Sequence, residues 1–318
     1  MSLITPSIGY KPFRYPWAYE AWLRQQQCHW LPEEVPLTDD VKDWRMKLTQ
    51  EEKNLLTQIF RFFTQADVSV AENYVNNYLG LFKPTEIIMM LTAFANSETV
   101  HVAAYAHLLD TVGMPETEYL TFMKVKEMKD KYDYFSNFTV DNPREVAKTL
   151  AGFGAFTEGL QLFASFAMLL NFSRFGKMRG MSQMIAWSVR DETLHCENII
   201  NLFHTYCAEN PKLLDRSLKE EIAQICQTIV EHEDAFIDLA FEMGPVEGMT
   251  ADEIKQYIRF IADRRMLQLH LRPIYGVKKN PIPWIDEILN APEFTNFFEN
   301  RSTEYSRAAT EGSWEDVF

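Results

Sequence analysis

The chain has 318 residues, 47% of them hydrophobic, and its 31 basic and 45 acidic side chains give a formal net charge of −14. A chain of this length can bury a large core, and because no linker rich in Pro, Gly or Ser interrupts its middle, we expect one main domain. The acidity disfavours direct binding to nucleic acid or to an anionic membrane surface.

Apolar runs and cysteines predict the compartment. The N-terminus has no basic segment followed by an apolar one, and the longest apolar runs, such as LFASFAMLL, are well short of a membrane span. No two cysteines have a spacing such as Cys-x-x-Cys, which favours reduced thiols over disulfides. We therefore expect a cytoplasmic protein that binds no membrane. The cysteines are Cys28, Cys196, Cys207 and Cys226.

Residues 1–45 are rich in Pro and aromatic side chains, and we expect an irregular N-terminal arm with one short helix near Ala18–Gln27. Thr49 then begins a capping box with Glu52, and apolar residues follow at helical spacing. Residues 46–298 are predicted to form an all-α bundle of long helices, because no strand-like alternation competes with them. Further helices are expected at Pro84–Val112, Glu116–Phe135, Pro143–Phe175, Lys177–Glu209, Pro211–Met243 and Ala251–Leu271.

Two Glu-x-x-His pairs lie inside these helices, Glu98 with His101 and Glu192 with His195. Residues three apart share a helix face, so each pair offers one oxygen and one nitrogen to a single point. One such pair alone is weak evidence for a metal site, because short motifs also arise by chance. The surrounding sequence therefore decides how the pairs are interpreted.

Two single carboxylates stand in equally apolar helices. Asp67 continues the line of Phe60 and Phe63, and Glu158 stands within GFGAFTEGLQLFASFAMLL. A lone ionised carboxylate in a core costs several kcal/mol, roughly 2–7 kcal/mol even for an unpaired neutral polar group. Such side chains must therefore be exposed, protonated or bound to something.

Together, four helices supply Asp67, Glu98 with His101, Glu158, and Glu192 with His195. This is the pattern of di-iron and di-manganese carboxylate bundles, with an Asp in place of the first single Glu. Four carboxylates neutralise two divalent ions, and oxygen ligands with two imidazoles suit iron or manganese. The alternative is a set of surface carboxylates and hydrogen-bonded core histidines.

Tyr105 lies one helical turn beyond His101 and shares its face. Leu162 and Phe166, which follow Glu158 by four and eight residues, are expected to shield it from solvent. A tyrosine in a dry pocket beside an oxygen-activating metal pair can be oxidised by one electron. The alternative is an ordinary packed core tyrosine.

The chain resembles the small, radical-generating subunit of class I ribonucleotide reductase, a ferritin-like di-metal carboxylate family. The resemblance extends from WLPEEV through DWRMKLTQEE, QADVSVAEN, SETVHVAAYAHL, TEGLQLFASF and RDETLHCE to TEYSR. It implies that one metal is held by Asp67, Glu98 and His101, and the other by Glu158, Glu192 and His195. It also implies a radical on Tyr105, an outward path through Trp30 and Asp191, and a tail tyrosine, Tyr305, that passes the radical on.

The same resemblance implies cofactors and partners. All six ligand positions hold carboxylate or His and the radical position holds Tyr105, so the metal-free branch and the branch with Phe there do not fit. Two iron ions are expected, with manganese left open; a manganese form would need a flavoprotein activase. A homodimer is expected, through the segments near Pro84–Val112 and Pro143–Phe175.

After Phe298 the apolar periodicity stops, so residues 299–318 are predicted to be a flexible tail. The tail ends on Trp314, Val317 and Phe318, which are expected to anchor it to a large catalytic subunit. Two other functions stay open: a stand-alone di-metal oxidase, which would work without a partner, and an iron-storage protein, which would assemble into a cage. The redox tyrosine and the tail favour the reductase subunit.

Overall fold

The computed structural model describes residues 2–119, 121–135 and 138–290. Within these ranges every regular element is a helix, apart from one isolated β-bridge between Val246 and Met249. The α-helices are α1 (Pro16–Gln27), α2 (Thr38–Met46), α3 (Gln50–Asn73), α4 (Thr85–Val112), α5 (Lys126–Phe135), α6 (Pro143–Ala151), α7 (Phe163–Leu170), α8 (Arg179–Glu209), α9 (Arg216–Ala240), α10 (Ala251–Gln268) and α11 (Trp284–Leu289).

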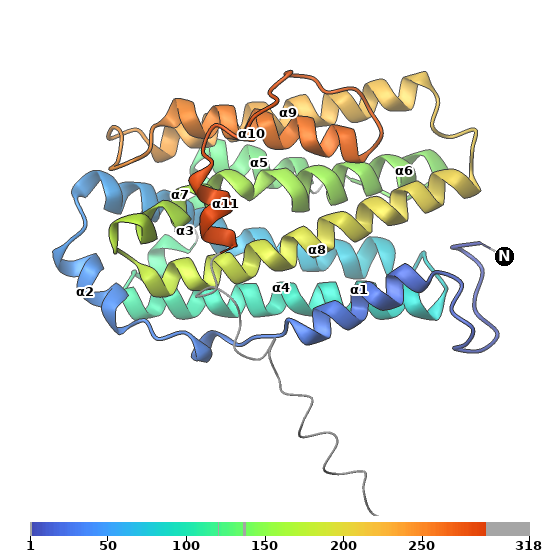
Figure 1. The fold of residues 1–318 in the computed structure, drawn as a ribbon, viewed down its shortest axis with the longest axis horizontal. Coiled ribbons are helices and arrows are strands. Elements are labelled where there is room, and N and C mark those ends of the chain that lie inside the picture. Colours follow the sequence, from blue (N-terminus) through green and yellow to red (C-terminus); the bar gives the residue numbers. More distant parts are fainter. Residues whose placement is uncertain (1, 120, 136–137, 291–318) are drawn as a thin grey trace, which may run out of the picture.

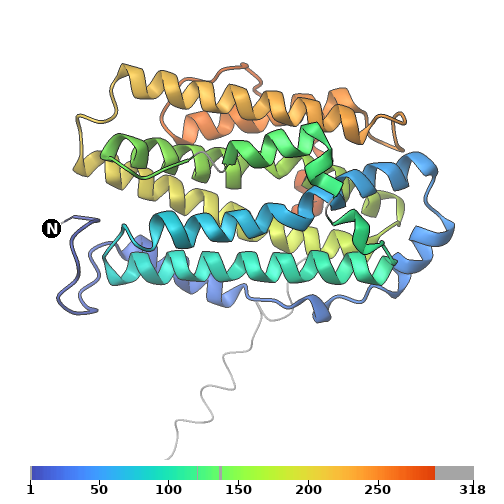
Figure 2. The same ribbon diagram turned by 180° about the vertical axis from the view of Figure 1, so that it is seen from behind.

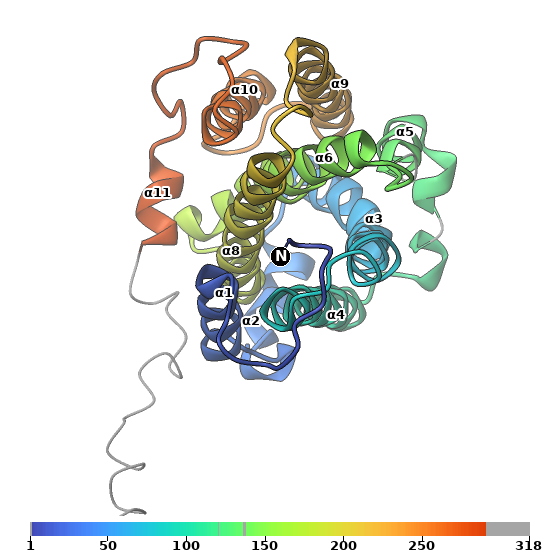
Figure 3. The ribbon, with the colours of Figure 1, turned by 90° about the vertical axis from the view of Figure 1, so that its right-hand side faces the viewer.

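The predicted bundle of long helices is confirmed. In Figure 1, α9 and α10 lie along one side of the molecule and α1 and α4 along the other, with α8 running between them. The reverse view in Figure 2 shows α3 beside α4, which agrees with the contacts between these helices. Viewed from the end in Figure 3, α3, α4, α6 and α8 surround the interior of the bundle. The four helical segments predicted to carry the ligands therefore face one another.

Two helix predictions were wrong in detail. The N-terminal arm contains a second helix, α2, whose first turn holds Asp39 and Asp40 and whose last turn holds Arg45, so its charges match the helix dipole. The predicted helix Glu116–Phe135 is instead two short 3₁₀ turns followed by α5. Thr117 and Thr121 are β-branched, and such residues favour helices less than unbranched ones. The hydroxyl of Thr121 also donates to the carbonyl of Thr117, and such side-chain bonds to the backbone compete with regular helix formation.

The predicted helix Pro143–Phe175 is continuous in its course but changes its winding. Between α6 and α7, residues Gly152–Gln161 form a π-helical segment that is entirely buried. A Cβ atom on Gly154 would lie 2.4 Å from Cγ2 of Ile199 on α8, so only glycine allows the two helices to come this close. This close packing brings Glu158 next to the ligand positions of α8.

Two segments, α4 and Pro143–Phe175, are long and apolar enough to cross a membrane by length and composition alone, but 56% and 100% of their most apolar windows are buried inside the bundle. Core helices of a bundle account for this apolarity. The same burial bears on the expected homodimer: the most apolar window of Pro143–Phe175 is fully buried within the chain, whereas α4 keeps exposed positions along its outer face. None of the four cysteines, all of which lie within the described residues, takes part in a disulfide.

Candidate metal centre

The bundle brings the six predicted ligands together in its interior. Asp67 comes from α3, Glu98 and His101 from α4, Glu158 from the π-helical segment, and Glu192 and His195 from α8. Every one of these side chains is at most 1% exposed. The helices that carry them are long and apolar. The charged groups lie in the core because they stand on the helix faces that point inward.

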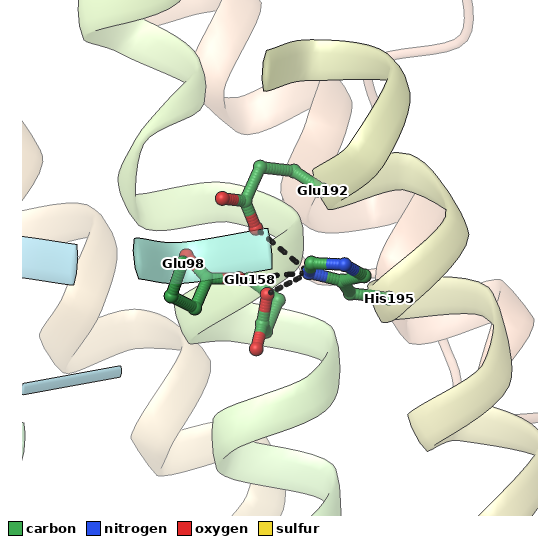
Figure 4. Close-up of side chains that lie close together, drawn as sticks. All are labelled: Glu98, Glu158, Glu192 and His195. Carbon is green, nitrogen blue, oxygen red and sulfur yellow. Dashed lines mark ion pairs between the residues drawn. The ribbon is translucent and has the colours of Figure 1, made fainter. Parts of the chain in front are cut away.

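The donor atoms form two groups that share one residue. Oxygen and nitrogen atoms of Glu98, Glu158, Glu192 and His195 lie within 4.8 Å of one another, and so do those of Asp67, Glu98 and His101. Figure 4 shows the first group, with the three carboxylates directed at the His195 ring. The sequence assigned Glu98 to one metal only, whereas the geometry places it between both groups.

Many of the polar atoms here have no hydrogen-bond partner among the described residues. Both carboxylate oxygens of Asp67, of Glu158 and of Glu192 lack one, as does Oε1 of Glu98. Nδ1 of His195 lies 2.9 Å from Oε1 of Glu98 but without hydrogen-bond geometry. Buried, unsatisfied oxygens that converge on two points are what a pair of divalent cations requires, so the residues present fit such a pair.

The charges of the cluster perturb one another strongly. Burial and the nearby carboxylate of Glu98 raise the pKa of Asp67 to about 8. Burial, followed by Glu98 and Glu158, raises the pKa of Glu192 well above its usual range. Burial lowers the pKa of His195, but contacts with Glu158 and Glu98 outweigh it and bring the pKa to about 9. Without cations, the cluster therefore retains protons in their place.

Each histidine is oriented by a second partner on its outer side. Nε2 of His101 lies 3.3 Å from Oδ2 of Asp191, which also accepts a 2.8 Å hydrogen bond from Nε1 of Trp30. Nε2 of His195 lies 3.2 Å from Oε1 of Gln25 on α1. Both imidazoles thus direct Nδ1 toward the cluster and fix this tautomer through Nε2.

Gln25 and Ser97 connect the two sides, and the sequence analysis missed both. Nε2 of Gln25 donates to Oγ of Ser97 at 3.1 Å, and Oγ of Ser97 lies 3.4 Å from Oδ2 of Asp191. Ser97 directly precedes Glu98, which is a local signal of proximity to the site. Gln25 gives no such signal, because only the packing of α1 against α4 brings it there.

Tyr105 occupies a dry pocket beside the cluster, as predicted. It is 4% exposed, and its ring centroid lies 6.4 Å from that of His101 and 4.7 Å from that of Phe63. Its hydroxyl donates to Oγ of Ser188 at 3.0 Å. Burial and then the charge of Asp67 raise its pKa well above the usual range, so the phenol stays protonated at rest.

The residues around Tyr105 are only partly those expected. Leu162 and Phe166 are buried as predicted, but the ring in contact with Tyr105 is that of Phe63, which lies 5.9 Å from that of Phe166. Ser188, which was not predicted, donates its own proton to the carbonyl of Met184. The tail residues Tyr305, Trp314, Val317 and Phe318 lie outside the described residues.

Comparison with known proteins gives a consistent result. The family "Ribonucleotide reductase, small chain" matches residues 7–281. The chain is 43% identical to a probable ribonucleoside-diphosphate reductase small subunit of Invertebrate iridescent virus 3, covering 99% of this chain and 88% of that protein. It is 31% identical to the ribonucleoside-diphosphate reductase subunit beta of Chlamydia pneumoniae, covering 93% and 89%.

Solved structures show the same fold. The R2 subunit of a ribonucleotide reductase from Clostridium botulinum superposes with a TM-score of 0.82 at 24% identity, over 92% of this chain and 95% of that one. Dimanganese(II)-NrdF of Streptococcus sanguinis superposes with a TM-score of 0.75 at 19% identity, over 90% and 100%. At these sequence identities the superpositions show a shared fold and nothing about function.

Proposed function

This chain belongs to the ribonucleotide reductase small-chain family, and we propose that its buried carboxylate and histidine cluster holds two metal ions next to an oxidisable Tyr105. It is the small, radical-generating subunit of a class I ribonucleoside-diphosphate reductase, an oxidoreductase whose large subunit carries out ribonucleotide reduction. This membership sets aside the stand-alone oxidase and the iron-storage protein.

The six side chains divide between two ions. Asp67, Glu98 and His101 would hold one ion, and Glu158, Glu192 and His195 would hold the other. Glu98 belongs to both donor groups, so it could contribute an oxygen to either ion. Four carboxylates against two divalent cations make a neutral cluster. When bound, the metal pair would supply the redox chemistry: electrons for O2 activation in the iron form, and the oxidising power that reaches Tyr105.

Iron and manganese use the same kinds of ligand, so the ligand set does not determine which of the two metals is bound. We propose two iron ions; manganese in their place would require a flavoprotein activase as a further partner. Metal analysis of protein purified from its own host decides between them.

Tyr105 supplies one electron and releases its phenolic proton when it is oxidised. Ser188 holds the phenol in place as an acceptor, because its own proton is already committed to the carbonyl of Met184. Phe63 and the buried surroundings keep water away from the ring. A radical formed there is protected from quenching by solvent.

The outward path is proposed to begin at His101 and pass through Asp191 and Trp30. The Trp30 ring is 1% exposed and lies 6.1 Å from the His101 ring. Its indole can lose an electron while Asp191 accepts the hydrogen bond from Nε1. Tyr305 in the tail then passes the radical to the large subunit. The last residues, from Trp314 onward, anchor the tail to that subunit.

We further propose a homodimer through α4. Its outer face carries five exposed side chains, none of them charged: Ile88, Thr92, Asn96, Thr99 and Ala103. An uncharged helix face suits contact with a second copy better than contact with water.

We also propose that the protein is cytoplasmic.

The observation that carries this function is the convergence of unsatisfied carboxylate oxygens on two points that share Glu98. The test is reduction of a ribonucleoside diphosphate by the metal-loaded chain together with a matching large subunit. We expect turnover only with both subunits present. Tyr305→Phe should keep the subunits associated but abolish turnover, and deletion from Trp314 onward should abolish association; full turnover by the truncated chain at low concentration would contradict the anchoring role.

A further inference from the structure

A second tyrosine stands beside the cluster, next to His195 rather than His101. Tyr74 follows Asp67 by seven residues, two helical turns along the same face, and begins the π-helical segment Tyr74–Tyr78. Its ring centroid lies 6.3 Å from that of His195, and the Tyr105 ring lies 6.4 Å from that of His101. Each histidine of the cluster therefore has one tyrosine at nearly the same distance.

The surroundings of Tyr74 are drier than those of Tyr105. Its side chain is fully buried, and its ring packs edge-on against Phe153 at 5.1 Å and Phe94 at 6.2 Å. Its hydroxyl has no hydrogen-bond partner among the described residues. A buried phenol normally finds a partner, so this hydroxyl calls for an explanation.

Glu158 and Tyr74 flank the same histidine of the cluster. Oε2 of Glu158 lies 3.4 Å from Nδ1 of His195, the histidine whose ring lies 6.3 Å from that of Tyr74. Both oxygens of Glu158 also lack hydrogen-bond partners among the described residues. Glu158 is therefore the carboxylate we take as the acceptor of the phenolic proton.

Tyr78 extends the arrangement by one step. It is fully buried, its hydroxyl likewise has no partner among the described residues, and its ring lies 6.2 Å from that of Tyr74. Tyr74 and Tyr78 are therefore two adjacent buried phenols, the first of which lies beside His195. Ordinary core packing would be served equally well by phenylalanine, which leaves no unsatisfied hydroxyl.

We propose that Tyr74 is a second redox-active tyrosine of this subunit, which donates an electron to the oxidised metal pair when Tyr105 does not. This rests on the proposed function, because O2 reduced at the metal pair is the oxidant. Tyr74 loses one electron to the metal pair, its O–H bond breaks, and the proton passes to a carboxylate oxygen of Glu158. The product is a neutral tyrosyl radical on Tyr74, which Tyr78 can reduce in turn.

The test uses the full chain with Tyr105→Phe, loaded with ferrous iron, exposed to O2 and frozen for electron paramagnetic resonance. We expect a tyrosyl signal in this variant that falls at least tenfold when Tyr74→Phe is added. Tyr257→Phe is the matched control, because Tyr257 is 3% exposed but lies on α10, and adding it should leave the signal unchanged. Two zinc ions in place of iron should give no signal.

A second label identifies the residue independently of any deletion. With 3-fluorotyrosine at position 74 in the Tyr105→Phe chain, the signal should show fluorine hyperfine splitting. Metal content and circular dichroism of each variant confirm that two ions and the fold are retained.

The outcomes separate this proposal from the proposed function. A tyrosyl signal in the parent but none in Tyr105→Phe with two ions bound overturns the role of Tyr74 alone. A Tyr105→Phe signal that survives Tyr74→Phe, or that lacks fluorine splitting, overturns it as well. A parent signal that is lost with Tyr74→Phe and kept with Tyr105→Phe supports Tyr74 and contradicts the role of Tyr105.

Discussion

Trp30 donates the hydrogen of its indole Nε1 to Oδ2 of Asp191 at 2.8 Å, and that same oxygen lies 3.3 Å from Nε2 of His101. One carboxylate oxygen thus joins a residue of the N-terminal arm to a side chain of the metal cluster. Burial raises the pKa of Asp191, but its contacts with His101 and Arg190 outweigh this and lower it, so the carboxylate stays ionised. Asp191 can therefore serve both neighbours as an acceptor.

Replacing Asp191 should separate radical formation from radical transfer. Asp191→Ala removes the acceptor that orients both Trp30 and His101, and loss of such an outer partner typically costs about 10- to 100-fold in activity or metal affinity. We expect turnover with the large subunit to fall by that order while the tyrosyl signal still forms. The two are measured by substrate reduction and by electron paramagnetic resonance; unchanged turnover would exclude Asp191 from the path.

Glu98 should be the most damaging ligand to remove. Glu98→Ala takes a donor from both groups, so we expect the chain to lose tight binding of both ions, whereas Glu192→Ala should mainly weaken one. Glu86→Gln is a matched control, because Glu86 is also buried on α4 but accepts hydrogen bonds from the backbone of Arg14 and Tyr15. Metal analysis after dialysis gives the answer, and two tightly held ions in Glu98→Ala would refute the assignment.

The sequence identified all six clustered side chains because their signal is local. A Glu and a His three residues apart must share a helix face, and an acid in an apolar helix must be satisfied in some way. The partners Gln25 and Ser188 could not be found this way, since each acts on a residue at least 83 positions away. Long-range packing, which no short motif records, determines those contacts.

The π-helical winding of one segment could also not be predicted from the sequence. Pro143–Phe175 has the apolar content of one long helix, and nothing local in it predicts that Gly152–Gln161 adopts π-helical winding. The close approach of Gly154 to Ile199 is a tertiary constraint. Only the assembled bundle likewise shows that the most apolar window of Pro143–Phe175 is fully buried within the chain.

The metal-free chain should lose stability as the pH rises. Asp67 has a folded pKa of about 8 against a usual value of 3.8, so the folded state binds the extra proton between these limits. Stability then falls with rising pH over that window, by up to about 1.4 kcal/mol per pH unit for one such group. His195, with its pKa raised from 6.5 to about 9, acts in the same direction between those values.

Thermal or denaturant unfolding of metal-free protein at pH 6 and pH 8 measures this effect. Asp67→Asn removes one titrating group, so its pH dependence should be shallower than that of the parent. Bound zinc should also flatten it, because cations replace the protons. A metal-free parent that is more stable at pH 8 than at pH 6 would contradict the account of the cluster.

Lys131 and Glu233 form a second buried charge pair, outside the metal cluster. Nζ of Lys131 lies 2.6 Å from Oε1 of Glu233, both side chains are fully buried, and the ammonium lies 4.0 Å from the centroid of the Phe62 ring. Lys131→Met leaves the acid unpaired and should cost about 3–5 kcal/mol of unfolding free energy. Lys131→Met with Glu233→Leu should recover most of this; denaturant unfolding of both variants tests it, and equal losses would rule out the pairing.

The central claim is that two ions held by this cluster oxidise Tyr105, and electron paramagnetic resonance of the reconstituted chain tests it most directly. The parent, loaded with ferrous iron and O2 or with manganese and an activase, should show a tyrosyl signal at two ions per chain. Tyr105→Phe keeps the ring packed against Phe63 and should remove the Tyr105 signal. The tyrosyl signal that remains should differ in its splitting and disappear with Tyr74→Phe. The account would be contradicted by a parent that holds two oxidised ions without a tyrosyl signal, or by a Tyr105→Phe spectrum identical to that of the parent.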